Sequence, residues 1–168
     1  MTDPGPSGSL LIVWHSRTGA AEQAARAAAA GADEAGYPAR LLRAEEATVA
    51  HMAAAGGYLF VCPENLGTMT GAMKEFFDRC YYPLLGAIEG RPYASVVTAG
   101  SAGQGAQAQI ERIVTGWRLR QVQPGLILDC QAQTSAQILA PKQLESGAIR
   151  QCRELGQGFA AGLDIGIF

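Results

Sequence analysis

The clearest indication of the fold is the stretch Leu10-Leu-Ile-Val-Trp14, followed by His15-Ser-Arg-Thr-Gly-Ala-Ala21. An uninterrupted apolar run is typical of a strand covered on both faces, as in a parallel sheet. The segment from Ala20 to Ala32 is alanine-rich, which favours a helix whose small side chains let it sit close to the sheet. The residues from Ser16 to Ala21 are therefore predicted to join a first strand to a first helix.

Three more apolar runs end in turn residues, and a weaker strand fits residues 39–43. The runs are Tyr58-Leu-Phe-Val-Cys62, Ala94-Ser-Val-Val-Thr98 and Leu126-Ile-Leu128. Apolar residues at helical spacing lie between or after them, in stripes headed by Met73, Ala106 and Leu144. Strand and helix thus alternate about five times, which predicts an α/β fold: a doubly wound parallel sheet with helices on both faces.

Length and composition suit one globular domain. The chain has 168 residues, of which 48% are hydrophobic and 17% charged, so it is too apolar for a disordered protein. We expect residues 1–8 to form a flexible N-terminal tail and residues 9–168 a single domain. The net charge of −2 is mixed along the chain, which argues against a nucleic-acid or membrane surface.

No segment reads as a secretory signal, and no apolar run approaches the roughly 18 residues of a membrane span, so a cytoplasmic protein is expected. Cys62, Cys80, Cys130 and Cys152 show no CxxC spacing and no histidine in ligand register. They are predicted to be small buried hydrophobes, and no metal site is expected. His15 and His51 are interpreted as structural.

The first loop has the parts of a phosphate-binding site. A helix N-terminus offers free N–H groups and the positive end of the macrodipole. Ser16 and Thr18 add hydroxyl donors, and Gly19 lets the backbone approach a ligand closely. The alternative is that Ser16 or Thr18 merely caps the helix. A GxxxxGK[ST] loop is absent, and GxGxxG does not follow the first strand.

Two further loops follow neighbouring strands. One runs from Cys62 to Gly71 and is longer than a short crossover needs; the other runs from Thr98 to Gly105 and is small and polar. In doubly wound sheets, ligands bind outside the carboxyl ends of the strands. The three loops are therefore predicted to share one binding site.

These loops carry a family resemblance. Ser16-Arg-Thr-Gly-Ala-Ala21 resembles the SxTGxT phosphate loop of flavodoxins, except that Ala21 lacks the last hydroxyl. Pro63-Glu-Asn-Leu-Gly67 with Thr70-Gly-Ala-Met-Lys74 resembles the second loop of NAD(P)H-dependent FMN reductases and related flavodoxin-family quinone reductases. Thr98-Ala-Gly-Ser-Ala-Gly103 is similar to their third flavin-contacting loop. The resemblance implies a flavodoxin-like three-layer sandwich with five parallel strands in the order 2-1-3-4-5.

The same resemblance implies FMN as cofactor, with its phosphate in the first loop and its ribityl chain and ring against the other two. Arg17 is a candidate to offset the missing hydroxyl at Ala21. Glu64 is a candidate to orient the ring or its substrate. The implied flavin-binding residues are Ser16, Arg17, Thr18, Gly19, Ala20, Ala21, Pro63, Glu64, Asn65, Leu66, Gly67, Thr68, Met69, Thr98, Ala99, Gly100 and Gly103.

Flavin chemistry resides in the cofactor, so few catalytic side chains are needed. The expected function is an oxidoreductase that passes electrons from NADH or NADPH to a quinone, flavin or similar acceptor. The alternatives are a flavodoxin-type electron carrier and a flavodoxin-like interaction module without flavin. Such carriers are usually strongly acidic and sandwich the ring between aromatic side chains, whereas both flavin-side loops here lack aromatics. The resemblance also suggests a homo-dimer or homo-tetramer, with Tyr81, Tyr82 and Trp117 as candidate contacts.

Overall fold

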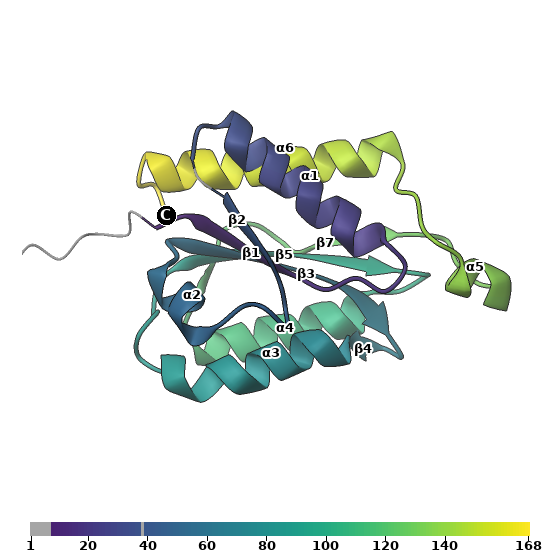
Figure 1. The fold of residues 1–168 in the computed structure, drawn as a ribbon, viewed down its shortest axis with the longest axis horizontal. Coiled ribbons are helices and arrows are strands. Elements are labelled where there is room, and N and C mark those ends of the chain that lie inside the picture. Colours follow the sequence, from purple (N-terminus) through teal and green to yellow (C-terminus); the bar gives the residue numbers. More distant parts are fainter. Residues whose placement is uncertain (1–7, 38) are drawn as a thin grey trace, which may run out of the picture.

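The computed structural model describes residues 8–37 and 39–168, so the first seven residues of the predicted N-terminal tail lie outside the described residues. Strands and helices alternate along the chain in an α/β arrangement (Figure 1). In chain order the elements are β1 Leu10–Trp14, α1 Ala20–Glu34, β2 Ala39–Arg43, α2 Val49–Ala54, β3 Gly57–Asn65, β4 Thr68–Met69, α3 Gly71–Tyr81, the 3-10 helix η1 Tyr82–Leu84, β5 Pro92–Ala99, α4 Gln104–Gly116, β6 Arg120–Gln121, β7 Leu126–Asp129, α5 Ser135–Leu139 and α6 Ser146–Asp164.

The sheet has the predicted flavodoxin-like order. Its parallel strands run β2-β1-β3-β5, and both β6 and β7 pair with β5. β6 and β7 together take the place of the predicted fifth strand. Between the pairs Tyr93–Gln121 and Val96–Leu126, this part of the chain has two residues more than the facing part of β5. That segment contains Pro124, which has no N–H to donate to the ladder, so the fifth strand is split into two pieces.

Helices cover both faces of the sheet (Figure 1). On one face α1 and α6 lie side by side and pack on Leu10, Ile12, Leu59 and Val61. Small residues on both helices allow this contact. An added Cβ at Gly31 of α1 or at Gly156 of α6 would run into the backbone of the other helix. The sequence therefore permits an unusually close contact between these two helices.

On the other face α3 and α4 cover a second core, in which aromatic rings contact one another. Phe60 packs against Phe76 and Phe77, and Phe77 packs against Trp117. The apolar stripe predicted for the helix after residue 71 points into this core, as expected. Trp117 is buried completely and donates its indole N–H to the carbonyl oxygen of Tyr81, at 2.9 Å. Trp117 therefore lies inside the domain and cannot be the intersubunit contact suggested for it. Tyr82, another of the suggested contacts, is 75% exposed.

The region after the third strand differs from the predicted loop. β3 continues beyond Cys62 to Asn65 and turns back through Leu66 and Gly67 into β4, which makes an antiparallel hairpin. Both turn residues have positive φ, 54° and 74°, as a two-residue hairpin turn requires. Within the described part of the chain, no helix is both long and apolar enough to cross a bilayer.

Candidate flavin site

The three predicted loops meet at one cavity of about 490 Å³ over the carboxyl ends of β1, β3 and β5. Eleven of the predicted flavin-binding residues line it: Arg17, Thr18, Ala20, Pro63, Glu64, Asn65, Leu66, Gly67, Thr98, Ala99 and Gly100. The prediction that these segments share one site is thus supported by their positions. That they contact flavin stays a prediction.

The first loop leaves the N-terminus of α1 free for a ligand. The hydroxyl of Ser16 accepts a hydrogen bond from the N–H of Gly19, at 3.1 Å, which shapes the loop. Gly19 is the residue before the helix, has φ 101°, and no side chain caps α1. Because the first-turn N–H groups of a helix have no acceptor within the helix, those of Ala20 and Ala21 can point at an anion.

The N-terminus of α4, unlike that of α1, is capped by an acidic side chain, that of Glu64. Its carboxylate accepts hydrogen bonds from the N–H groups of Gly103 and Ala106, each at 3.0 Å. The end of α4 is therefore already occupied by an acidic side chain, as the helix dipole favours. Of these two helix ends at the cavity, only that of α1 remains available for a phosphate. Each Glu64 oxygen accepts one of these bonds, so the carboxylate holds the start of α4; its predicted role in orienting the ring or its substrate stays a prediction.

Six predicted residues do not line the cavity. Ser16, Gly19 and Gly103 act through the backbone bonds and turns just described. Ala21 is buried in the core against the sheet, Met69 is buried on the opposite face, and Thr68 bonds the carbonyl oxygens of Asn65 and Met69. Ala21 thus fills a packing position where the resemblance implied a missing phosphate donor.

Ser101 and Ala102 of the predicted third loop also line the cavity, and its remaining wall, which was not predicted, is formed by the segment after β7. Cys130, Ala132, Ile138 and Lys142 come from that segment. It is tied to the first loop, because the N–H of Lys142 donates to the carbonyl oxygen of Thr18, at 2.7 Å. Gln23 adds to this connection by donating to the carbonyl oxygen of Lys142, at 2.7 Å, and accepting from the N–H of Leu144. The segment has no ligand motif, and only the fold brings it to the site.

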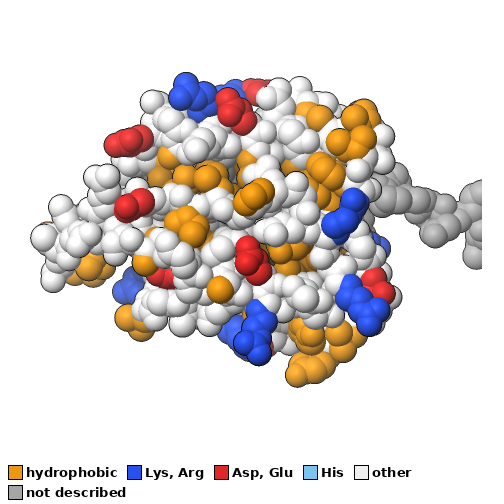
Figure 2. All heavy atoms as spheres, turned by 180° about the vertical axis from the view of Figure 1, so that it is seen from behind, with side chains coloured by type: hydrophobic (Ala, Val, Ile, Leu, Met, Phe, Trp, Pro, Cys, Tyr) orange, Lys and Arg blue, Asp and Glu red, His pale blue; other side chains and the backbone are white. Residues whose placement is uncertain are grey.

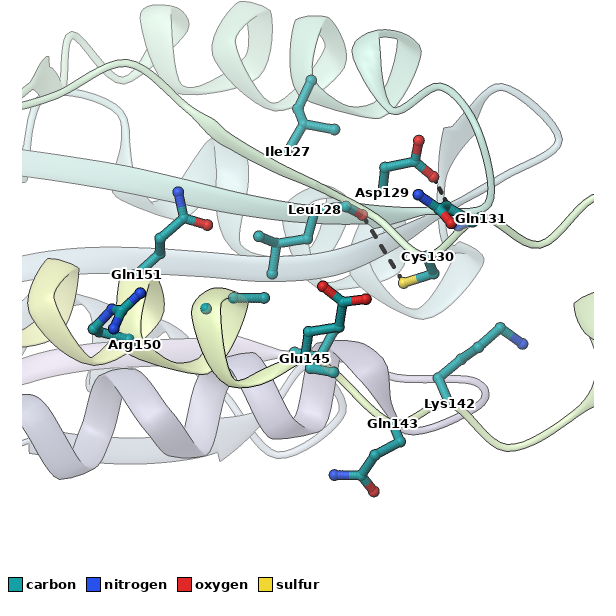
Figure 3. A pocket seen from close by; sticks show the side chains of 13 residues that line it. Ile127, Leu128, Asp129, Cys130, Gln131, Lys142, Gln143, Glu145, Arg150 and Gln151 are labelled. Carbon is teal, nitrogen blue, oxygen red and sulfur yellow. Dashed lines mark hydrogen bonds between the residues drawn. The ribbon is translucent and has the colours of Figure 1, made fainter.

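A second cavity of about 510 Å³ lies beside the first, between β7 and the start of α6 (Figure 3). It shares Cys130 and Lys142 with the first cavity, but no residue of the three predicted loops lines it. We therefore assign the flavin site to the first cavity, which lies at the carboxyl ends of the central strands, where this class of sheet binds ligands.

Three of the four cysteines are buried, as predicted, and Cys130 is half-buried in the wall of both cavities. Burial raises the pKa of the Cys62 thiol to about 12 and that of Cys152 to about 11. Burial also raises the pKa of Cys130. His51 takes part in a capping box with Thr48 at the start of α2, and His15 lies 3.9 Å from Glu45, away from the cavity wall.

A doubly wound sheet with this strand order and a cavity over its central strands defines a flavodoxin-like protein. Residues 30–132 match the family described as NADPH-dependent FMN reductase. The chain belongs to that family. The matched region includes the second and third loops and begins after the first.

Individual proteins that are similar in sequence or in structure are described as flavodoxins. A flavodoxin of Aquifex aeolicus is 31% identical over 109 residues, which cover 64% of this chain and 59% of that protein. The chain thus spans less than two thirds of that relative. A solved flavodoxin from Archaea superposes with a TM-score of 0.78 at 15% identity, covering 93% of this chain and 99% of the other. A WrbA-like flavodoxin of Agrobacterium tumefaciens superposes with a TM-score of 0.68 at 19% identity, and the match covers 94% of this chain and 98% of the other. At such identities the structural likeness concerns the fold.

FMN is the cofactor that this family and fold support, and the cavity fits its chemistry. A dianionic phosphate matches the uncapped end of α1 beside the cationic side chains of Arg17 and Lys142. A flat ring system matches the small residues Ala99, Gly100 and Ala102, which line the cavity without large side chains. The polar and apolar requirements of FMN are therefore both met by residues that line one cavity.

Proposed function

We propose that this protein is an NAD(P)H-dependent FMN oxidoreductase that passes electrons to a quinone, a flavin or a similar small acceptor. When bound, FMN would supply the redox chemistry by accepting a hydride and passing on electrons. The protein would bind the cofactor, orient it and leave one side of its ring accessible.

The observation that carries this proposal is the absence of aromatic side chains from the described lining of the cavity. In a carrier that sandwiches its flavin between aromatic rings, a nicotinamide has no room to stack. Here the ring would be bordered by Asn65, Leu66 and Gly67 on the hairpin and by the small residues that follow β5. An open ring face favours direct hydride transfer over one-electron exchange at a protein surface.

Each group of residues has a distinct role in this proposal. The first-turn amides of α1 and the hydroxyl of Thr18 would bind the phosphate. Glu64 would fix the position of the third loop through its bonds to Gly103 and Ala106. The segment after β7 would close the cavity on the side of Cys130 and Ala132.

Stopped-flow mixing of the FMN-loaded protein with NADH and with NADPH tests this proposal. Bleaching of the flavin absorbance at a rate that saturates with one nucleotide is expected. An acceptor panel of quinones, nitroaromatics, azo dyes and free flavin would then identify the substrate class. Negligible reduction by both nucleotides would contradict the enzyme proposal.

A flavodoxin-type carrier is the second candidate, favoured by the exposed apolar rim of the cavity. Leu66 at the hairpin tip is fully exposed, and Ile138 is 53% exposed. Apolar residues around a cofactor suit transient docking of a redox partner. A carrier should bind FMN and exchange electrons with a reductase protein, yet resist direct reduction by nucleotides. Failure to bind flavin at all would favour an interaction module.

A further inference from the structure

Lys142 lies where the phosphate loop, the cavity and the short helix α5 meet. Its backbone N–H bonds the loop at Thr18, and its side chain lines the cavity with Arg17. Its ammonium group donates to three carbonyl oxygens at the end of α5, those of Gln137, Ile138 and Ala140, at 2.6, 3.2 and 2.7 Å. Figure 3 shows the side chain extending away from Glu145 and Arg150.

The three carbonyl groups satisfy the donors of this ammonium but do not neutralise its charge. Among the described residues, neither Lys142 nor Arg17 takes part in an ion pair. The other lysine, Lys74, is paired with Asp78 on the exposed face of α3. Against these two positive charges, the acidic residue that lines the cavity, Glu64, contributes one negative charge. The cavity therefore keeps positive charge that suits a bound anion.

We propose, on the basis of the proposed FMN site, that Lys142 is a ligand of the FMN phosphate, reached by exchanging the carbonyl groups of α5 for phosphate oxygens. Its flexible four-carbon stem starts at a backbone that already bonds the phosphate loop. A charge-assisted bond to phosphate is stronger than a bond to a neutral carbonyl group. This cation would add to Arg17 in a loop where Ala21 offers no hydroxyl.

This exchange of hydrogen-bond partners costs the fold little free energy. Every residue of α5 is exposed, so the released carbonyl groups would be hydrated by water rather than left unpaired in the core. The helix keeps its own N-terminal capping box between Thr134 and Gln137. Phosphate binding would therefore be coupled to the order of α5, whose residue Ile138 lines the same cavity.

Comparing FMN with riboflavin, which has the same ring but no phosphate, tests this proposal. Dissociation constants are measured by flavin fluorescence for the wild-type protein, Lys142→Met, Lys142→Arg and the control Lys74→Met. We expect Lys142→Met to weaken FMN about tenfold to a hundredfold and riboflavin less than about twofold. Lys142→Arg should keep most of the preference for FMN, because the cation remains, and Lys74→Met should change neither ligand.

Hydrogen exchange gives a second readout. FMN, but not riboflavin, should speed exchange of the amides of Ile138 and Ala140, which bond within α5. If Lys142→Met weakens the affinity for both flavins equally, Lys142 only holds α5. If it leaves the affinity for FMN unchanged, Lys142 is not part of the phosphate site. Either result overturns this inference alone. Binding of neither flavin by the wild-type protein would overturn the proposed function as well.

Discussion

The carboxylate of Glu64 at the end of β3 accepts a 3.0 Å hydrogen bond from the backbone N–H of Gly103, the residue before α4. This bond joins the second predicted loop to the third. It also explains why two helix ends at one cavity differ, since one is closed by an internal acid and the other stays open to a ligand.

We predict that Glu64→Gln lowers the free energy of unfolding by about 1–2 kcal/mol, because a charged acceptor at a helix N-terminus is replaced by a neutral one. Urea unfolding followed by circular dichroism measures this. Asp78→Asn is the control: its partner Lys74 lies on an exposed helix face, and such a pair is worth under about 0.5 kcal/mol. Equal effects of the two substitutions would contradict a special role for Glu64.

Gly103→Ala is expected to destabilise the protein by about 1–3 kcal/mol, since φ is 107° there and overpacking adds strain. An added Cβ would come within 2.5 Å of the Ile127 side chain. Gly158→Ala is the matched control, because this helical glycine has open space around it. This substitution should stabilise the protein by about 0.5–1 kcal/mol. Thermal or urea unfolding separates the two signs.

Thr18→Asp should weaken FMN about tenfold or more, because it places a negative charge in the cavity wall near the expected phosphate and removes a hydroxyl donor. Riboflavin, which lacks the phosphate, should be affected much less. Thr18→Ser keeps the hydroxyl and serves as the control in the same fluorescence titration. Unchanged FMN affinity in Thr18→Asp would remove this loop from the site.

Cys130 should react with a thiol reagent before the other three cysteines of the native protein, because it is half-buried while they are buried. Its pKa is raised by burial, so the reactive thiolate and hence the rate should increase with pH through and above the usual range of a free thiol. FMN should slow this labelling, since Cys130 lines the cavity. Mass spectrometry of the labelled protein, with Cys130→Ser as control, measures both effects.

Local sequence determined the order of the strands and helices and the three loops at the sheet edge. Continuous apolar runs such as Leu10–Trp14 reveal burial on both faces, and the alanine-rich α1 reveals close helix packing. The hairpin after β3 was harder to predict, because Leu66 is an unusual residue at positive φ and the local pattern suggests a loop.

Which helix end is open became visible in the folded chain alone, because it depends on a carboxylate 39 residues away from Gly103. The fold likewise placed Lys142, 124 residues after Thr18 in the chain, beside the first loop through a backbone bond to Thr18 and the bond from Gln23. Contacts of this kind leave no spacing pattern in the sequence. They arise when parallel strands bring their carboxyl ends to one edge of the sheet, so that distant segments meet at one cavity.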